Sequence, residues 1–232
     1  MNEPRAPRAK RTAKGKEHPV RARLEVDERR AQLLGLGLRI FSERPYDDVA
    51  IDDIAQAAGV SKGLLYHYFP TKRDFYVAAL REAARDLIAQ TIGADTGGDE
   101  NQGERLRQGL TTYLDFVERR GGAYVALMRG GVGSDPEVAS IVEGTRVAIL
   151  EYIVALLPPG MAGPLAITAL RGWIGFVEAA SIDWVARRSV TVEEIVNLAH
   201  AALFDVLMRA AAMSQASFEL PPEVRQLRAG IE

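Results

Sequence analysis

Hydrophobic positions recur every three or four residues along most of the chain, which is the spacing of one buried face of an α-helix. This pattern predicts helices over residues 27–43, 51–58, 61–69 and 71–92. It predicts further helices at 106–117, 137–157, 164–187 and 191–213. No run alternates with a period of two for long enough to predict a sheet. The chain is therefore expected to be all-α.

Capping residues support several of these helix starts, because Ser, Thr and Asp side chains accept hydrogen bonds from the free amides of a first turn. Proline also suits the first helical position. Such signals precede five of the predicted helices: Asp27, Ser61, Thr71 with Asp74, Asp135 with Pro136, and Thr191 with Glu194.

The most informative segment is the pair of short helices over residues 51–69. Ala55 in the first helix is small enough to let two helices cross closely. Gly59 can adopt the backbone conformation of a tight turn at little steric cost. Two short helices joined in this way are the sequence form of a helix-turn-helix, which places its second helix in the major groove of DNA.

One face of the second helix carries Lys62, Gly63, Tyr66 and His67, a set rich in hydrogen-bond donors and free of acid. Lys62 can donate to guanine acceptors or to phosphate, and Gly63 lets the backbone approach closely. Tyr66 and His67 can donate and can also lie flat against sugar or a thymine methyl group. We expect this face to bind DNA rather than to pack in the core, whereas Tyr68 could do either.

Residues 55–76 resemble the DNA-binding signature of the tetracycline-repressor (TetR) family, A-x-A-A-G-V-S-K-G-L-L-Y-H-Y-F-P-T-K-x-x-F-Y. The resemblance implies an N-terminal three-helix DNA-binding domain followed by a helical domain for effector binding and dimerisation. It implies DNA contacts from the turn and the second helix, and a phosphate contact just after them: Ser61, Lys62, Gly63, Tyr66, His67 and Lys72.

Three positions depart from the family pattern. Ala50 stands where a threonine commonly caps the second helix and touches phosphate. Leu64 stands where threonine is frequent, so a hydroxyl contact is lost. The order His67-Tyr68 reverses the frequent Tyr-His.

Charge is distributed unevenly. Residues 1–24 contain eight basic and two acidic side chains, a net charge of +6, while the whole chain has −2. A basic arm on an acidic body fits a polyanion at one end. Residues 1–26 show no periodicity and are expected to be disordered without a partner, with Arg21 and Arg23 reaching the minor groove. The alternative is a solubilising tail.

The expected organisation is a basic arm (1–26), a DNA-binding domain (27–75), an effector-binding and dimerisation domain (76–213) and a flexible tail (214–232). Large apolar and aromatic residues beside polar ones are the candidates for the effector site: Tyr113, Phe116, Tyr124, Met128, Tyr152, Trp173, Phe176 and Glu178. Such a lining predicts a small lipophilic effector. The helix over 71–92 would connect the two sites through Leu80, Leu87 or Ile88.

Composition limits the alternatives. The absence of cysteine excludes disulfides and thiolate chemistry. The longest apolar run, Val147–Leu157, is shorter than the roughly 20 residues of a membrane span and contains Glu151. With no secretory signal, a bacterial cytoplasmic location is expected.

Among function classes, an enzyme is disfavoured because the three histidines are far apart and no catalytic or metal-binding motif is found. Neither a metal nor a cofactor is expected. The prediction is a homodimeric repressor that binds a palindromic operator in double-stranded DNA and has no membrane partner. A nonspecific architectural DNA binder and a transcriptional activator remain as alternatives.

Overall fold

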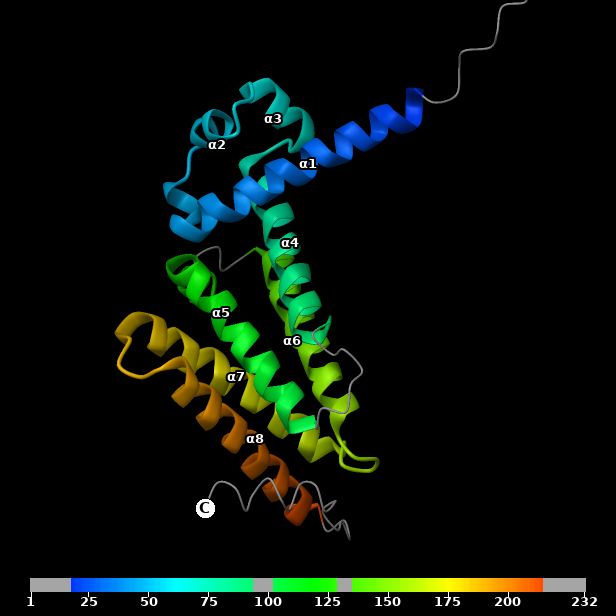
Figure 1. Cartoon of the computed structure of the whole chain (residues 1–232), viewed down its shortest axis with the longest axis vertical. Helices are drawn as coiled ribbons and strands as arrows, with labels where there is room; N and C mark the ends of the chain where they lie inside the picture. Colours follow the sequence, from blue (N-terminus) through cyan, green and yellow to red (C-terminus); the bar gives the residue numbers. More distant parts are fainter. Residues whose placement is uncertain (1–17, 94–101, 129–134, 215–232) are drawn as a thin grey trace, which may run out of the picture.

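The computed structural model describes residues 18–93, 102–128 and 135–214, and the regular elements in those ranges are all helical (Figure 1). In chain order they are α1 (His18–Glu43), the 3-10 turn η1 (Tyr46–Asp48), α2 (Ile51–Ala57), α3 (Lys62–Tyr68), α4 (Lys72–Gly93), α5 (Gln102–Met128), α6 (Pro136–Leu156), α7 (Pro164–Arg187) and α8 (Val192–Met213). The first three helices form one end of an elongated molecule, and α4 leads from them to α5–α8. The predicted all-α fold is confirmed.

A first buried cluster packs α1, α2 and α3 against the start of α4. Ile54, Leu65 and Phe69, three apolar residues of the two short helices and their end, are buried in it. Phe75 of α4 lies against Phe69, with ring centroids 4.8 Å apart. Gly37 of α1 makes room for that ring, because a Cβ there would come within 2.5 Å of Phe75. The helix-turn-helix is thus fixed to α4 by close aromatic packing.

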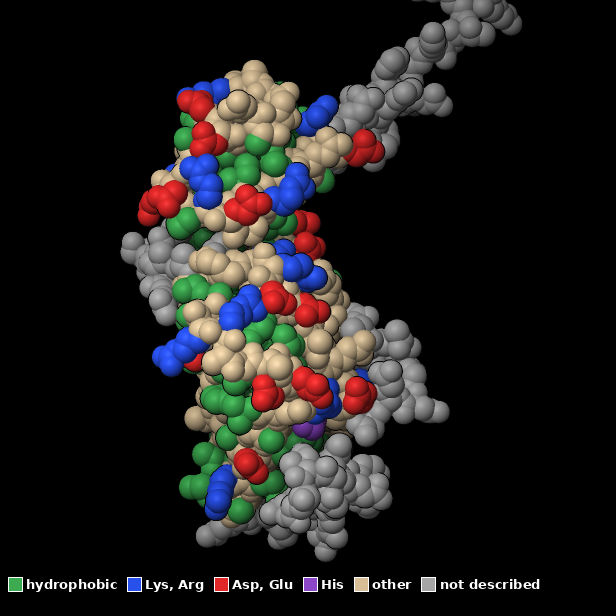
Figure 2. Space-filling model, turned by 60° about the vertical axis from the view of Figure 1, so that its left-hand side comes forward, with side chains coloured by type: hydrophobic (Ala, Val, Ile, Leu, Met, Phe, Trp, Pro, Cys, Tyr) green, Lys and Arg blue, Asp and Glu red, His purple; other side chains and the backbone are tan. Residues whose placement is uncertain are grey.

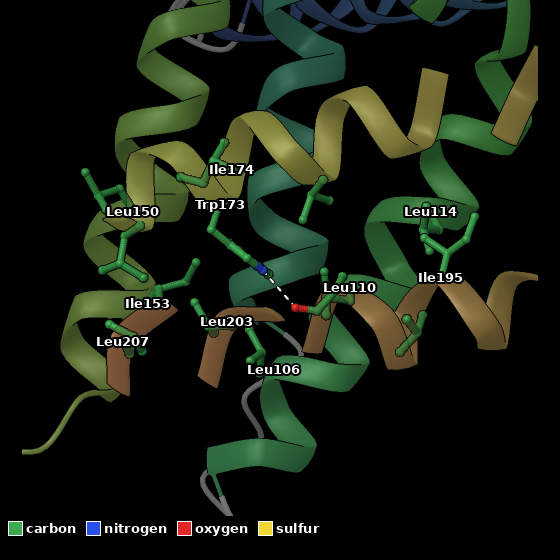
Figure 3. Close-up of a cluster of buried hydrophobic side chains, with 14 of the residues drawn as sticks. Leu106, Leu110, Leu114, Leu150, Ile153, Trp173, Ile174, Ile195, Leu203 and Leu207 are labelled. Atoms are coloured by element: carbon green, nitrogen blue, oxygen red, sulfur yellow. Dashed lines mark hydrogen bonds between the residues drawn. The ribbon is translucent and has the colours of Figure 1, made fainter. Parts of the chain in front are cut away.

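A second cluster joins α5–α8 around Trp173 (Figure 3). The indole Nε1 of Trp173 donates to the carbonyl oxygen of Ala199 on α8 at 2.8 Å. This hydrogen bond satisfies the one polar atom of a side chain that is otherwise buried among leucine and isoleucine residues. It ties α7 to α8 at the centre of the cluster.

A third cluster connects α4 with α5, which bends sharply at Gly121 (φ 22°, ψ −102°). Positive φ is strained for residues with a side chain, so glycine suits this position. The bend carries Tyr124, 8% exposed, into contact with a cluster that includes Leu87 of α4 and Phe116 of α5.

Several predicted caps are present. The Ser61 hydroxyl accepts from the Leu64 amide at 3.1 Å, and Asp135 accepts from the amide of Glu137 at 2.9 Å. Thr191 and Glu194 form the expected capping box. These helix starts were predictable because each depends on side chains within three residues of the end.

The start of α1 differs from the prediction. The helix begins at His18 rather than at Asp27, so Arg21 and Arg23 lie on helical backbone instead of in a disordered arm. Pro19 suits a first helical position, and the arginine, alanine and leucine that follow are good helix formers. Their periodicity is weak because basic residues separate the apolar ones. Residues 1–17 of the predicted arm and most of the predicted C-terminal tail lie outside the described residues.

The helices α7 and α8 are long and apolar enough to cross a membrane by length and composition, with mean hydropathies of 1.3 and 1.4. The longest uninterrupted apolar run does not reveal this, because isolated charges divide each helix. Each has seven buried side chains. Hydrophobic side chains are also exposed among charged ones on the lower half of the face in Figure 2.

Candidate DNA-binding surface and effector cavity

The turn between α2 and α3 has the geometry of a helix-turn-helix. Gly59 has φ +62°, a left-handed conformation that favours glycine. Ala55 is buried at the crossing of the two helices. Leu65 has no exposed surface and packs the inner side of α3 into the first buried cluster. The residues on the opposite side of α3 are therefore directed outward.

That outward side carries the predicted DNA-reading residues. Lys62, Gly63, Tyr66 and His67 are all exposed, Tyr66 by 40%. Tyr68 is half-buried and packs against the first cluster. Of these two neighbours, His67 therefore lies on the exposed face of α3 and Tyr68 does not. The sequence had left this choice open because the order His67-Tyr68 reverses the frequent Tyr-His.

Two lysines near this face already have partners within the protein. Lys62 Nζ lies 2.8 Å from a carboxylate oxygen of Asp52 on α2. This hydrogen bond raises the pKa of the exposed Lys62 ammonium. Lys72 Nζ donates to the carbonyl oxygen of Val49 at 2.8 Å and lies 4.1 Å from the centre of the Tyr46 ring. An ammonium has three donors, so Lys72 keeps donors for a phosphate.

The remaining predicted contacts are less well placed. Ser61 is exposed, but its hydroxyl caps α3. The side chains of Arg21 and Arg23 lie outside the described part of the chain. Ala50 is the N-cap residue of α2 and provides no side-chain hydrogen bond, as the departure from the family pattern predicted.

A cavity lies between α4, α5, α6 and α7, and it has an empty volume of about 970 Å³ when the space at its mouth is counted. Seven of the eight predicted effector residues line it: Tyr113, Phe116, Tyr124, Met128, Tyr152, Trp173 and Glu178. Leu80 and Leu87 of α4 also line it, whereas Ile88 does not.

Phe176 is the exception among the eight. It is 38% exposed and lies outside the cavity lining. Its neighbour Val177 and the indole of Trp173 face inward instead. Because α7 is apolar on more than one side, periodicity alone does not identify which side of the helix faces the cavity.

The cavity wall has one ion pair. Arg146 of α6 donates from Nε and Nη2 to the two carboxylate oxygens of Glu178 on α7, at 2.9 and 2.8 Å. The hydrogen bond to Glu178 is the main reason why the pKa of Arg146 is raised. Sequence reasoning named Glu178 as a lining residue but missed Arg146, which is 32 positions away.

Two tyrosine hydroxyls on α5 hydrogen-bond to each other in the same cavity, Tyr113 and Tyr124. Burial raises the pKa of Tyr113 to about 12 and also raises that of Tyr124, so both stay protonated at neutral pH. The hydroxyl oxygen of Thr91 on α4 is buried and has no hydrogen-bond partner. The rest of the lining is mostly apolar.

A second, smaller space of about 460 Å³ lies between α1, α4 and α5. It is bounded by Leu38 and Phe41 of α1 and by Arg120 of α5. The two spaces share five wall residues: Leu80, Ala83, Phe116, Tyr124 and Leu127. Helix α1, which packs against the helix-turn-helix in the first cluster, therefore adjoins the wall of the larger cavity.

Comparisons with known proteins agree with this geometry. The family profile described as "Bacterial regulatory proteins, tetR family" matches residues 33–79, and that for the "Tetracyclin repressor-like, C-terminal domain" matches residues 102–204. A crystal structure of a tetR-family transcriptional regulator from Streptomyces coelicolor is 33% identical, with a TM-score of 0.66. The alignment covers 88% of this chain and 89% of that one. The chain belongs to the TetR family of transcriptional regulators.

Two curated relatives of this TetR-family regulator match over part of their length. The HTH-type transcriptional activator FasR of Mycolicibacterium smegmatis is 32% identical over 135 residues, which are 58% of this chain and 61% of FasR. The HTH-type transcriptional regulator EthR of Mycobacterium tuberculosis is 28% identical over 127 residues, 54% of this chain and 52% of EthR. The chain thus spans between half and two thirds of these relatives.

The TetR-family regulator also has a polar contact between α4 and α6 that the sequence did not predict. Arg73, next to Lys72, donates to Asp135 from Nε at 2.5 Å and from Nη2 at 2.7 Å. It also donates to Glu137 of α6 at 2.9 Å, and Arg81 contacts the same glutamate. The start of α4 is thereby bound to the start of α6, a cavity helix.

Within the described residues of this TetR-family regulator, no group of three or more histidine, aspartate or glutamate side chains could hold a metal ion. The two candidate sites are the donor-rich face of α3 and the largely apolar cavity.

Proposed function

We propose that this protein is a ligand-responsive repressor that binds a palindromic operator as a dimer and is released by a small lipophilic effector. The observation that carries the proposal is the exposed face of Lys62, Tyr66 and His67, joined through α4 to an apolar cavity. Helix α4 begins just after α3 and lines the cavity with Leu80 and Leu87, so it connects the two features.

The dimensions of α3 suit DNA reading. A helix of seven residues is about 10 Å long, and the major groove is about 12 Å wide. Lysine donates to guanine or phosphate, and tyrosine and histidine donate to base edges or the backbone. Arg21 and Arg23 would add contacts from the end of α1, and Lys72 would hold a phosphate.

The apolar surface of α7 and α8 supports a homodimer. Large hydrophobic side chains on these helices are exposed: Leu165, Phe176, Leu198 and Met213. Small residues between them, such as Gly172 and Gly175, are exposed too and allow helices to approach closely. A second copy would cover this surface and place two α3 helices about 34–36 Å apart, as two successive major grooves require.

Release by an effector would follow from the link between the cavity and α4. Leu80 and Leu87 line the cavity, while Arg73 binds α6 through Asp135. A ligand that changes the distance between α4 and α6 would move Lys72 and α3 with them. The two recognition helices of the dimer would then no longer match the operator.

The test is selection of binding sites from random duplex DNA, followed by affinity measurements. We expect a palindrome to be enriched and Lys62→Ala or Tyr66→Ala to weaken binding by about tenfold or more, the loss typical of one base contact. Arg85→Ala is the control, because Arg85 is exposed on α4 and pairs with Glu82. Flat enrichment would instead support an architectural DNA binder, and unchanged affinity in both variants would overturn the proposed reading face.

Activation is a second candidate, because the relative FasR is described as an activator. A reporter placed downstream of the selected palindrome separates the two. A repressor lowers expression when bound, and an activator raises it.

A further inference from the structure

Four polar side chains of the cavity form a cluster that carries no net charge. Arg146 and Glu178 neutralise each other through two parallel hydrogen bonds, and Tyr113 and Tyr124 hydrogen-bond to each other. Both tyrosines lie within electrostatic range of Arg146 and Glu178. The side chains come from α5, α6 and α7, so the cluster forms where the three helices meet around the cavity.

The ion pair spans the boundary between cavity and solvent. The side chain of Arg146 is 37% exposed and that of Glu178 is 17% exposed. On its outer side Arg146 lies 3.6 Å from Glu143, which is exposed and also pairs with Arg171. Arg146 therefore contacts two carboxylates, those of Glu178 and Glu143. Its positive charge is compensated and is not available to a ligand.

The rest of the cavity is mostly apolar, and it is elongated. It follows α4 from Leu80 to Thr91, a length of about 16 Å at the helical rise. Isoleucine, valine and leucine side chains from α5, α6 and α7 face this stretch. Thr91, with its unpartnered hydroxyl, is the polar exception on the α4 wall.

We infer that the cavity selects an uncharged amphiphile, whose hydroxyl or amide head binds the cluster of Arg146, Glu178, Tyr113 and Tyr124 and whose apolar body extends along α4. The inference rests on the proposed function and names the chemical class of its effector.

The reason is electrostatic. A carboxylate head would have to displace Glu178 from Arg146 or lie beside it, and like charges repel strongly where water is scarce. An ammonium head would meet the same difficulty with Arg146. A hydroxyl or primary amide can donate to Glu178 and accept from a tyrosine without disturbing the ion pair. A neutral head therefore binds without leaving either charge of the ion pair unpaired.

The experiment uses four probes with one dodecyl chain: dodecanol, dodecanamide, dodecanoate and dodecylammonium. Binding to the full-length protein is measured by calorimetry at neutral pH, at concentrations where each probe is monomeric. We expect the alcohol and the amide to bind about tenfold or more tightly than either charged probe. Equal or tighter binding of dodecanoate or dodecylammonium overturns the inference.

Substitutions of the ion pair make the test specific. Glu178→Gln should improve dodecanoate binding by about tenfold, because Arg146 loses its nearest carboxylate. Arg146→Gln should instead improve dodecylammonium binding, and it serves as an independent test should Glu178→Gln fail to fold. Glu151→Gln is the matched control, since Glu151 is exposed on α6 and outside the cavity lining. Either ion-pair variant, if it folds and its preference among the probes does not change, contradicts the inference.

Operator affinity is measured in parallel. A protein that binds its palindrome and is released by dodecanoate alone retains the proposed function and refutes the neutral-head inference. A protein that binds DNA but none of the four probes refutes both the inference and the effector part of the proposed function.

Discussion

Arg73 donates two hydrogen bonds to the carboxylate of Asp135, and that same carboxylate caps the first turn of α6. One residue thus completes a cavity helix and also binds the residue that follows Lys72. The pair is 62 positions apart in the chain. Ligand-driven movement of α6 would reach the start of α4 directly through this contact.

The variant Asp135→Asn separates the two roles, because asparagine caps a helix as well as aspartate does but cannot form the ion pair. We expect ligand affinity to be little changed, while the ligand-induced loss of operator affinity shrinks by about fivefold or more. Operator affinity is measured with and without the effector. Arg85→Gln, which removes an ion pair within α4, should leave this coupling intact. If the effector lowers the operator affinity of Asp135→Asn as much as that of the wild type, the ion pair does not couple the two sites.

The same pair should be insensitive to ordinary changes of pH. The hydrogen bond from Arg73 lowers the pKa of Asp135 to about 2, below the value of about 3.9 for an unfolded aspartate. Its stabilising effect is therefore present above about pH 4 and is lost as pH falls towards 2. The difference in unfolding free energy between wild type and Asp135→Asn should stay constant from pH 8 to 5.

Ala50→Thr should stabilise the DNA-binding end. Ala50 has the extended conformation of an N-cap residue (φ −87°, ψ 149°) but gives no side-chain hydrogen bond. A threonine hydroxyl there can accept from an amide of the first turn of α2, which is worth about 1 kcal/mol. Urea unfolding measures the gain. Ala57→Thr, exposed within the same helix, should instead cost about 0.5 kcal/mol.

Asp52→Asn should strengthen operator binding. Asp52 pairs with Lys62 at 2.8 Å in the free protein, and this contact competes with DNA for the ammonium. We expect affinity to rise by about fivefold at low salt, the upper range for an exposed ion pair, and by less as salt screens the charges. Asp53→Asn is the matched control, because Asp53 pairs with Arg44 instead. An equal gain in both variants would point to a general charge effect.

His200 should make stability depend on pH. Burial is the main cause that lowers its pKa, with help from Arg107, whereas Glu104 and the Gly103 backbone oppose this shift. The unfolded chain therefore binds the proton more readily, and the unfolding free energy should fall as pH drops below about 6.5. His200→Gln should give a flatter profile between pH 7.5 and 5. Identical slopes in chemical unfolding would contradict this assignment.

Local features of the fold were predictable from the sequence, and long-range features were not. The cap of Ser61 and the capping box of Thr191 depend on neighbours three residues away. The pairs Arg73–Asp135 and Arg146–Glu178 depend on how distant helices pack, and surface charges in the sequence have many possible partners.

The cavity illustrates the same limit. Tyr113 and Trp173, which were named for their aromatic character, line the cavity. Phe176 was named for the same reason and lies outside the lining, since α7 is apolar on both its inner and outer sides. The helical start of α1 was missed for the opposite reason, because charged residues conceal a helix that has little apolar periodicity.

The wall shared by the two cavities limits how this protein can diverge. Phe116, Tyr124 and Leu127 border the effector cavity on one side and the space next to α1 on the other. A substitution here that admits a new molecule also changes the packing beneath the DNA-binding helices. A variant that acquires a new inducer in this way would also need a different inducer concentration for release from DNA. Ile149 and Ile153 line only the larger cavity, so substitutions there can change the inducer without changing the packing next to α1.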